Sequence, residues 1–275
     1  GLNSAKDLIK NLTPWLPPVP CEYIVAQGLE TWPFNGFDAS WSHDGKKIAF
    51  FCRINRDHAL VVIDAETGDI LRKVELPLDQ AFSPSFNADD CWIYFSAARN
   101  IQRDIYAIDI CYNADDSEVK YSSIQVTADE RFDTAPAVSP DGSKVVYIGS
   151  DGDFQHLFLY DVKRGETEQL TFGSFNDSSP SWSDDGSTVV YTSDEAGQIW
   201  NLYTLDLSTR TVKQWTEFAG GVETPIFARA SLDRVYYVVF RDDDQFHDLI
   251  YPNYEIFEAK LNLNNPIRQH ISENT

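Results

Sequence analysis

The segment Pro180-Ser181-Trp182-Ser183-Asp184-Asp185-Gly186 is followed at once by the β-rich run Thr188–Thr192. An Asp-Gly pair between two such runs predicts a tight hairpin turn, because glycine adopts positive φ without a Cβ clash. Close copies of the pattern stand at Trp41–Gly45 and Val138–Gly142. Three copies of one strand, turn and strand indicate an internal repeat.

Two weaker copies fall in the same register, at Pro84–Asp89 and at Pro225–Phe227. The five positions equivalent to the proline are separated by 45, 52, 44 and 45 residues, and they are Ala39, Pro84, Pro136, Pro180 and Pro225. A period of this length with several short strands is typical of propeller blades. We therefore predict an all-β fold, a β-propeller of four-stranded antiparallel blades, with five blades favoured and six possible.

Each repeat has the same expected content. Third strands end in an acidic residue, as in Leu60–Asp64, Ile105–Asp109, Leu157–Asp161 and Leu202–Asp206, and fourth strands are expected at 167–171, 212–216 and 267–271. A β-sandwich has no reason to repeat one aromatic-plus-turn pattern, whereas stacked blades need the same packing residue at each interface. We expect that residue to be buried in every copy, at Trp41, Phe86, Val138, Trp182 and Phe227.

The ends of the chain are less regular. Residues 1–21 are expected to form a short amphipathic helix, Ser4–Asn11, and a proline-rich arm or linker, while residues 22–275 form the propeller. A further strand at Glu22–Ala26 either closes the last blade or belongs to a sixth.

The Pro-x-Trp-Ser-x-Asp-Gly element, the third strand ending in Asp and the closing Glu168–Thr171 resemble the repeats of the TolB propeller. Related repeats occur in prolyl-oligopeptidase-type and tricorn-type propellers and in oligogalacturonate lyases. The resemblance covers about residues 37–272 and is specific for the fold. It implies a protein or peptide partner and a periplasmic or extracellular location, and the separate α/β domain of TolB has no counterpart here.

Charge narrows the choice of partners. Forty-three acidic residues against twenty-two basic ones give a net charge of −21, which repels phosphate backbones and anionic lipid surfaces. The sequence also lacks the run of about 18 apolar residues that a membrane span needs. We expect neither nucleic-acid binding nor membrane insertion, and the acidity equally serves solubility.

The four cysteines contain no C-x-x-C pair, which argues against zinc-ribbon and thioredoxin-like sites. Cys91 opens a second strand and Cys111 follows the antiparallel third strand, so we predict a disulfide between them. No such argument exists for Cys21 and Cys52, which are equally consistent with free thiols.

Catalytic motifs are missing from the sequence. We find no G-x-S-x-G elbow, no H-E-x-x-H and no phosphate-binding loop, so the chain leans toward a non-enzymatic role. Asp151 with Asp153, and Asp242–Asp244 with Asp248, offer oxygen ligands for Ca²⁺, but neither matches a calcium loop and both suit solvated turns. No cofactor or metal is expected.

The candidate binding residues lie where second strands pass into third strands and where one blade passes into the next. Loops at that end of a propeller vary and commonly carry the ligand. The residues are His58, Arg103, Asp104, Asp133, His156, Asp177, Trp200, Asn201, Glu223 and Tyr254.

We therefore expect a TolB-like protein-binding or scaffolding module, by itself or as one domain of a larger extracytoplasmic protein. One alternative is a propeller-type polysaccharide lyase or glycosidase using His58, His156 and carboxylates. Another is a substrate-gating domain of a peptidase.

Overall fold

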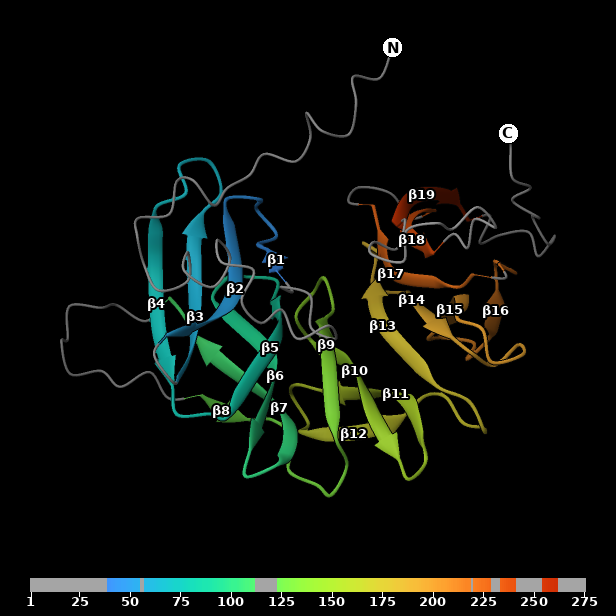
Figure 1. The fold of residues 1–275 in the computed structure, drawn as a ribbon, viewed down its shortest axis with the longest axis horizontal. Helices are drawn as coiled ribbons and strands as arrows, with labels where there is room; N and C mark the ends of the chain where they lie inside the picture. Colours follow the sequence, from blue (N-terminus) through green and yellow to red (C-terminus); the bar gives the residue numbers. More distant parts are fainter. Residues whose placement is uncertain are drawn as a thin grey trace, which may run out of the picture. The chain divides into compact units, whose positions relative to one another are not determined.

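The computed structural model describes residues 39–54, 57–111, 123–218, 220–228, 233–240 and 254–261. In these residues nineteen strands form five antiparallel sheets, each built from consecutive strands of the chain (Figure 1). Four sheets have four strands, and the fifth has three within the described ranges. The fold is all-β with five blades, as predicted.

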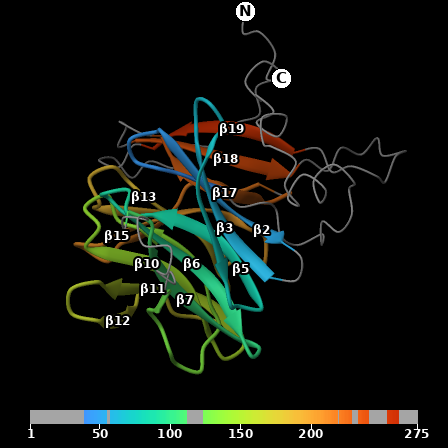
Figure 2. The same cartoon turned by 90° about the vertical axis from the view of Figure 1, so that its left-hand side faces the viewer.

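The strands follow the repeat closely. The first sheet holds β1 (Ala39–Trp41), β2 (Lys47–Ile54), β3 (Asp57–Asp64) and β4 (Ile70–Leu76), and the second holds β5 (Gln80–Phe86), β6 (Trp92–Arg99), β7 (Gln102–Asp109) and β8 (Ile124–Gln125). The third holds β9 (Asp133–Val138), β10 (Lys144–Asp151), β11 (Phe154–Asp161) and β12 (Glu166–Gln169). The fourth holds β13 (Asp177–Trp182), β14 (Thr188–Ser193), β15 (Asn201–Asp206) and β16 (Val212–Gln214). The fifth, three neighbouring strands in Figure 2, holds β17 (Val222–Phe227), β18 (Arg234–Phe240) and β19 (Tyr254–Lys260).

The chain divides into two compact units, and the boundary falls inside β7. Gly1–Ile101 and Tyr106–Gln125 form the first unit, and Gln102–Ile105 with Val126–Thr275 form the second. The third, fourth and fifth sheets all belong to the second unit, which also contains the first residues of β7.

The Asp-Gly turns owe their shape to local hydrogen bonds. In the third sheet, Ser139 Oγ donates to Asp141 Oδ1 at 2.6 Å, the Ser143 N–H donates to the same oxygen at 3.0 Å, and Gly142 has a φ of 71°. The Ser139 hydrogen bond, followed by those of Ser143, lowers the pKa of Asp141 to about 2. Positive φ is the backbone region that glycine occupies without strain, which explains the repeated Asp-Gly pair.

A β-bulge in β9 and another in β13 each lead to burial of the aspartate that begins the strand. Asp133 and Pro136 are both buried, although strict alternation would place residues three apart on opposite faces. The register shifts between Val146 and Ile148 opposite the bulge, where Ala135 has a φ of 50°. The fourth sheet repeats the burial pattern with Asp177 buried at its start. The extra residue of the bulge resets the alternation and turns the aspartate inward.

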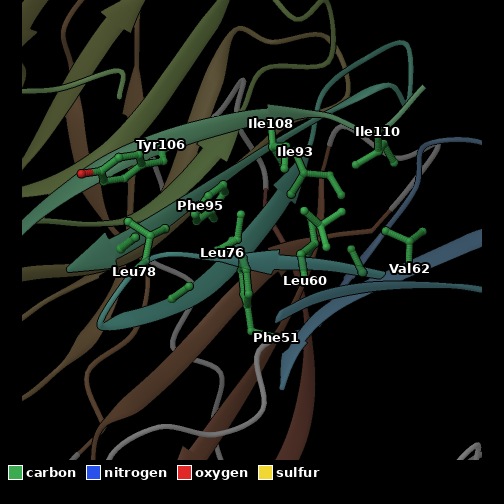
Figure 3. Packing of buried hydrophobic residues seen from close by; sticks show 14 of the residues in the cluster. Phe51, Leu60, Val62, Leu76, Leu78, Ile93, Phe95, Tyr106, Ile108 and Ile110 are labelled. Atoms are coloured by element: carbon green, nitrogen blue, oxygen red, sulfur yellow. The ribbon is translucent and has the colours of Figure 1, made fainter. Parts of the chain in front are cut away.

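The first unit is held by a continuous apolar core. Figure 3 shows Phe51, Leu60, Leu76 and Phe95 packed together between β2, β3, β4 and β6. The rings of Phe51 and Phe95 have centroids 5.1 Å apart, and Tyr106 stacks on Phe95 at 6.0 Å. Burial of each such side chain stabilises the fold by about 1.5–3 kcal/mol.

Four of the five repeated packing positions are buried as predicted: Phe86, Val138, Trp182 and Phe227. The expectation for Trp41 was wrong, because its side chain is 51% exposed. Trp182 packs against the sheet that precedes it in the chain, and its Nε1–H donates to the Ala137 carbonyl oxygen. Trp41 opens the first described sheet and therefore has no preceding sheet in the described chain.

The predicted disulfide is confirmed. Cys91 and Cys111 are bonded, with their Cα atoms 4.9 Å apart. Cys52 is also disulfide-bonded, which decides a question that the sequence left open. The expected helix at Ser4–Asn11, the arm, Cys21, and the strands at 22–26 and 267–271 lie outside the described residues.

Candidate functional site

In the second unit, the two ends of the strands carry different kinds of connection. We call one of them the loop edge. It is formed by residues 150–155 and 194–200, where second strands pass into third strands, and by residues 128–132 and 172–176, where one sheet passes into the next. The opposite end is the turn edge, formed by the Asp-Gly turns 139–143 and 183–187. Nine of the ten candidate residues lie in the second unit, at or beside the loop ends of strands, and the tenth, His58, lies in β3 of the first unit.

Hydrogen bonds join the loop edge across the third and fourth sheets. The Phe132 N–H donates to Ser150 Oγ at 3.0 Å, and the Ser150 N–H donates to the Phe132 carbonyl oxygen at 3.1 Å. Ser150 pairs with Gln155, whose N–H donates to Asn176 Oδ1 at 3.2 Å. Asn176 in turn donates through its backbone N–H and its side chain to Asp194. The loop edge is thus one hydrogen-bonded rim.

Beneath the rim, one threonine in each of three repeats bonds the start of a third strand. The N–H groups of Ile105, Leu157 and Leu202 donate to Thr127, Thr171 and Thr216 at 2.9, 2.9 and 2.8 Å. Thr171 Oγ1 then donates to Asp177 Oδ2 on the next sheet. Thr216 Oγ1 donates instead to Asn201 Oδ1 at 3.0 Å. The threonine hydroxyl therefore ties each strand to a buried polar side chain.

A buried histidine and a buried aspartate meet beside Thr171. His156 Nδ1 is 3.5 Å from Asp177 Oδ2, and His156 Nε2 is 3.1 Å from the Gly173 carbonyl oxygen. The Phe175 ring meets the imidazole edge-on at 5.3 Å. His156 is 1% exposed and Asp177 fully buried. The residue that the enzymatic hypothesis assigned to metal or acid–base chemistry is thus enclosed within the fold.

Two buried acids hold the equivalent positions one repeat earlier. Asp104 is 2% exposed and Asp133 fully buried. Burial, with contributions from Asp129 and Asp104, raises the pKa of Asp133 to about 7, while a hydrogen bond from Thr127 and the charge of Arg131 oppose the rise. Burial disfavours the carboxylate because it removes the charge from water.

The other candidates occupy varied positions. Asn201 is buried and accepts from Thr216 and from the Phe218 N–H. Trp200 is half-buried and its carbonyl oxygen accepts from the Val222 N–H at 2.8 Å, whereas Glu223 is exposed. Arg103 is half-buried.

The two remaining candidates are His58 and Tyr254. His58 is a half-buried residue of the first unit. Tyr254 begins β19, and its side chain lies outside what the structure describes. The structure therefore brings His156 together with Asp177, and the assignment of all ten residues to partner binding stays a prediction.

Sequence reasoning missed the apolar residues of the loop edge. Phe132 is 52% exposed, Phe172 is 67% exposed and Ile199 is 37% exposed. The sequence did contain a signal for two of them. Phe132 directly precedes the aspartate position of the repeat, and Phe172 directly follows the threonine position. Arg131 was also missed, and its guanidinium carbon lies 4.3 Å from the centroid of the Phe158 ring.

A shallow depression of about 400 Å³ lies on the turn edge, between the turns of the third and fourth sheets. Its lining includes Pro140, Lys144, Trp182 and Asp185. Asp185 already accepts hydrogen bonds from Ser183 and Ser187 within its own turn. These carboxylate contacts are those of a turn and need no ligand.

Neither a metal-ligand cluster nor a membrane-spanning helix is present in the described ranges. No three His, Cys, Asp or Glu side chains there are grouped to hold a metal ion, and Asp242–Asp244 with Asp248 lie outside those ranges. A helix of the length and apolarity required for membrane crossing is likewise missing from the described part of the chain.

Known structures share this fold. TolB from Acinetobacter baumannii aligns with a TM-score of 0.62 at 22% identity, over 80% of this chain and 50% of that chain. A putative TolB from Agrobacterium tumefaciens aligns with a TM-score of 0.63 at 18% identity, over 82% and 81%. The five sheets of this chain are therefore the blades of a β-propeller.

The sequence relatives specify the type of repeat. The family model of the TolB beta propeller domain matches residues 118–247. An uncharacterised protein of Agrobacterium fabrum is 33% identical over 143 residues, covering 47% of this chain and 44% of that protein. A TolB homolog of Protochlamydia amoebophila is 28% identical over 140 residues, covering 49% and 30%. Residues 118–247 are therefore similar to TolB-type propeller repeats, and the matched stretches span less than half of either curated relative.

Proposed function

We propose that this propeller binds a protein or peptide partner through the loop edge of its second unit. The observation that carries the proposal is the exposure of Phe132, Phe172 and Ile199 on a rim that backbone and side-chain hydrogen bonds hold in place. Large exposed apolar side chains on an ordered surface are typical of interaction sites. The varied loops suit recognition of an asymmetric partner better than the near-identical Asp-Gly turns do.

Charge suggests the chemistry of the partner. Exposed acidic side chains flank the apolar residues on the loop edge, at Asp129, Glu130 and Glu195. The net charge of −21 also attracts basic partners over long range. A peptide with apolar anchors and basic flanks fits both features.

An oxidising location is part of the proposal. Disulfides persist in the periplasm and outside cells and are rare in the cytosol. The Cys91–Cys111 bond and the disulfide of Cys52 therefore support a periplasmic or extracellular site of action. The TolB-type repeats point the same way.

The test is selection from a displayed random-peptide library, followed by affinity measurement with the enriched peptides. Phe132→Ala combined with Phe172→Ala should weaken binding at least tenfold, since each large apolar contact contributes about 1–2 kcal/mol. Trp200→Ala combined with Arg103→Ala tests the predicted residues in the same assay. The matched turn-edge control is Ser187→Ala, which should bind as the unmodified protein does. Loss of binding in the control with retention in the loop-edge variants would contradict the proposal.

A further inference from the structure

In the first unit, the turn of the second sheet has Asp90 at the position where the Asp-Gly turns have glycine. The Asp90 N–H donates to the Asn87 carbonyl oxygen at 3.0 Å. In the fourth sheet, the Gly186 N–H donates to the Ser183 carbonyl oxygen at 2.9 Å in the same way. Asp90 has a φ of 56°, a backbone conformation that residues other than glycine seldom adopt. We therefore expect its side chain to make a compensating interaction.

That interaction joins the Asp90 carboxylate to the turn of the first sheet. Oδ1 accepts from the His43 N–H at 2.6 Å, and Oδ2 accepts from the Asp44 N–H at 3.0 Å. His43 Nδ1 also lies 3.3 Å from Oδ1. Successive backbone N–H groups of a turn are a known arrangement for binding anions. We call the N–H groups of His43 and Asp44 the carboxylate seat of the first turn.

The junction between the third and fourth sheets has the same turns but lacks this carboxylate. Gly186 stands at the position of Asp90, and Asp141 of the third sheet stands at that of Asp44. A Cβ at Gly186 would lie 3.7 Å from Pro140 Cδ, so a side chain there would begin beside the third turn. Proline has no N–H, which leaves Asp141 as the remaining donor of the seat. Within the described part of the chain, the Asp141 N–H has no acceptor.

The depression of about 400 Å³ on the turn edge lies at this second seat. Its lining includes Gly186, Pro140 and Asp141, together with Lys144 at the start of β10. Lys144 forms no salt bridge with any residue that the structure describes. Asp141 is exposed, so a partner can reach its N–H. A backbone N–H and an ammonium group beside an open depression suit the binding of an anion.

The acidic side chains of the lining are compatible with a bound carboxylate. They are Asp141, Asp184 and Asp185. Two of them have counterparts in the first unit, Asp44 and Asp89, which stand beside the carboxylate of Asp90 without preventing its hydrogen bonds. Asp184 has no acidic counterpart, because Ala88 holds its position. The charge of Asp184 therefore weakens binding at the second seat.

We propose that this depression binds an acidic side chain of a partner polypeptide, whose carboxylate accepts from the Asp141 N–H and pairs with Lys144. The partner's carboxylate takes the place that Asp90 fills within the chain at the other junction. The site lies on the turn edge and is separate from the peptide site proposed for the loop edge. Because the net charge of −21 gives no long-range attraction for an acid, binding depends on these short-range contacts.

The experiment follows the amide NMR signals of the full chain during addition of N-acetylaspartate N-methylamide at constant ionic strength. The asparagine analogue of the probe is the neutral control. The Asp141 signal should shift saturably with the aspartate probe alone, whereas the Asp44 signal should stay in place because Asp90 already fills its seat. An Asp141 signal that does not shift, or that shifts equally with the neutral probe, would overturn the proposal.

Two reciprocal variants exchange the filled seat and the open seat. Gly186→Asp places a carboxylate of the chain itself at the second seat and should abolish the response of Asp141 to the probe. Asp90→Gly opens the first seat and should make the Asp44 signal respond. A Gly186→Asp variant whose Asp141 signal responds as in the unmodified protein would overturn the proposal.

Two charge variants give effects of opposite sign. Lys144→Gln should weaken binding of the aspartate probe about threefold, and Asp184→Ala should strengthen it about threefold, as is usual for exposed charge pairs. Asp184→Ala also copies the first unit, where Ala88 holds this position. Tighter binding by Lys144→Gln or weaker binding by Asp184→Ala would show that the probe's carboxylate does not occupy this seat.

Discussion

The indole Nε1–H of Trp182 donates to the carbonyl oxygen of Ala137 at 2.8 Å, which joins the fourth sheet to the third. The side chain is 7% exposed and packs in the core formed by β10, β11, β14 and β15. Trp182→Ala should therefore lower the free energy of unfolding by about 3–5 kcal/mol, the usual range for a large buried aromatic. Urea denaturation measures the loss.

Trp41→Ala is the matched control, because the two tryptophans hold the same position in their repeats. Trp41 is 51% exposed, so the change should cost under about 1 kcal/mol. Equal losses for the two variants would show that both tryptophans are core residues and would contradict the structure.

Thr171 supplies a second stability prediction. Its hydroxyl accepts from the Leu157 N–H and donates to Asp177, and all three groups are buried. Thr171→Val keeps the shape but leaves a donor and an acceptor without this partner, at about 1–3 kcal/mol for each unsatisfied group. Thr171→Ser keeps the hydroxyl and should cost much less. A Val variant as stable as the Ser variant would contradict the bridging role.

The Cys91–Cys111 bond closes a segment of 20 residues between β6 and the end of β7. Replacing both cysteines by Ser should lower the free energy of unfolding by about 3 kcal/mol, because the unfolded chain regains the entropy of the open loop. Alkylation of the native protein, followed by peptide mass analysis, should leave both residues unmodified without reductant. Ready alkylation of native Cys91 and Cys111 would rule out the bond.

The sequence predicted those features that depend on local geometry. Positive φ at Gly142 and Gly186 makes the Asp-Gly pair a turn in any copy of the repeat. Cys91 and Cys111 could be paired because antiparallel neighbours bring the end of one strand to the start of another. Strand order, turn positions and the third-strand ends follow from such short-range rules.

Whether a side chain is buried, and which residues it contacts, depends on the sheet that lies next to it, and the local sequence does not specify that sheet. Trp41 and Trp182 have the same local sequence, yet only the latter has a described preceding sheet to cover it. The bulge that turns Asp133 inward is set by a backbone conformation at Ala135 that the sequence does not reveal. For this reason, several candidate residues whose positions along the strands were predicted correctly were expected at the surface but are buried.

Gly149 and Ser193 hold equivalent positions in their repeats, so each can be replaced by the residue type of the other as a pair of matched variants. Gly149 pairs with Asp133 and His156, and Ser193 pairs with Asp177 and Asn201. A Cβ at Gly149 would lie 2.8 Å from Phe158 Cδ2 and 3.0 Å from Asp133 Oδ1. The side chain would therefore have to displace a buried ring and a buried carboxylate.

Gly149→Ser should destabilise the fold by about 1–3 kcal/mol, the usual cost of overpacking a core. Ser193→Gly creates no clash. It should cost about 0.5–1 kcal/mol through the extra backbone freedom of glycine in the unfolded chain, and about 1 kcal/mol more through loss of the hydroxyl's hydrogen bonds to the Asn176 carbonyl oxygen and the Glu195 N–H. Because the displaced carboxylate belongs to Asp133, Gly149→Ser should also alter the pH dependence of stability, whereas Ser193→Gly should leave it unchanged. Urea denaturation at two pH values measures both effects, and a Gly149→Ser variant with unmodified stability would show that Phe158 does not occupy this space.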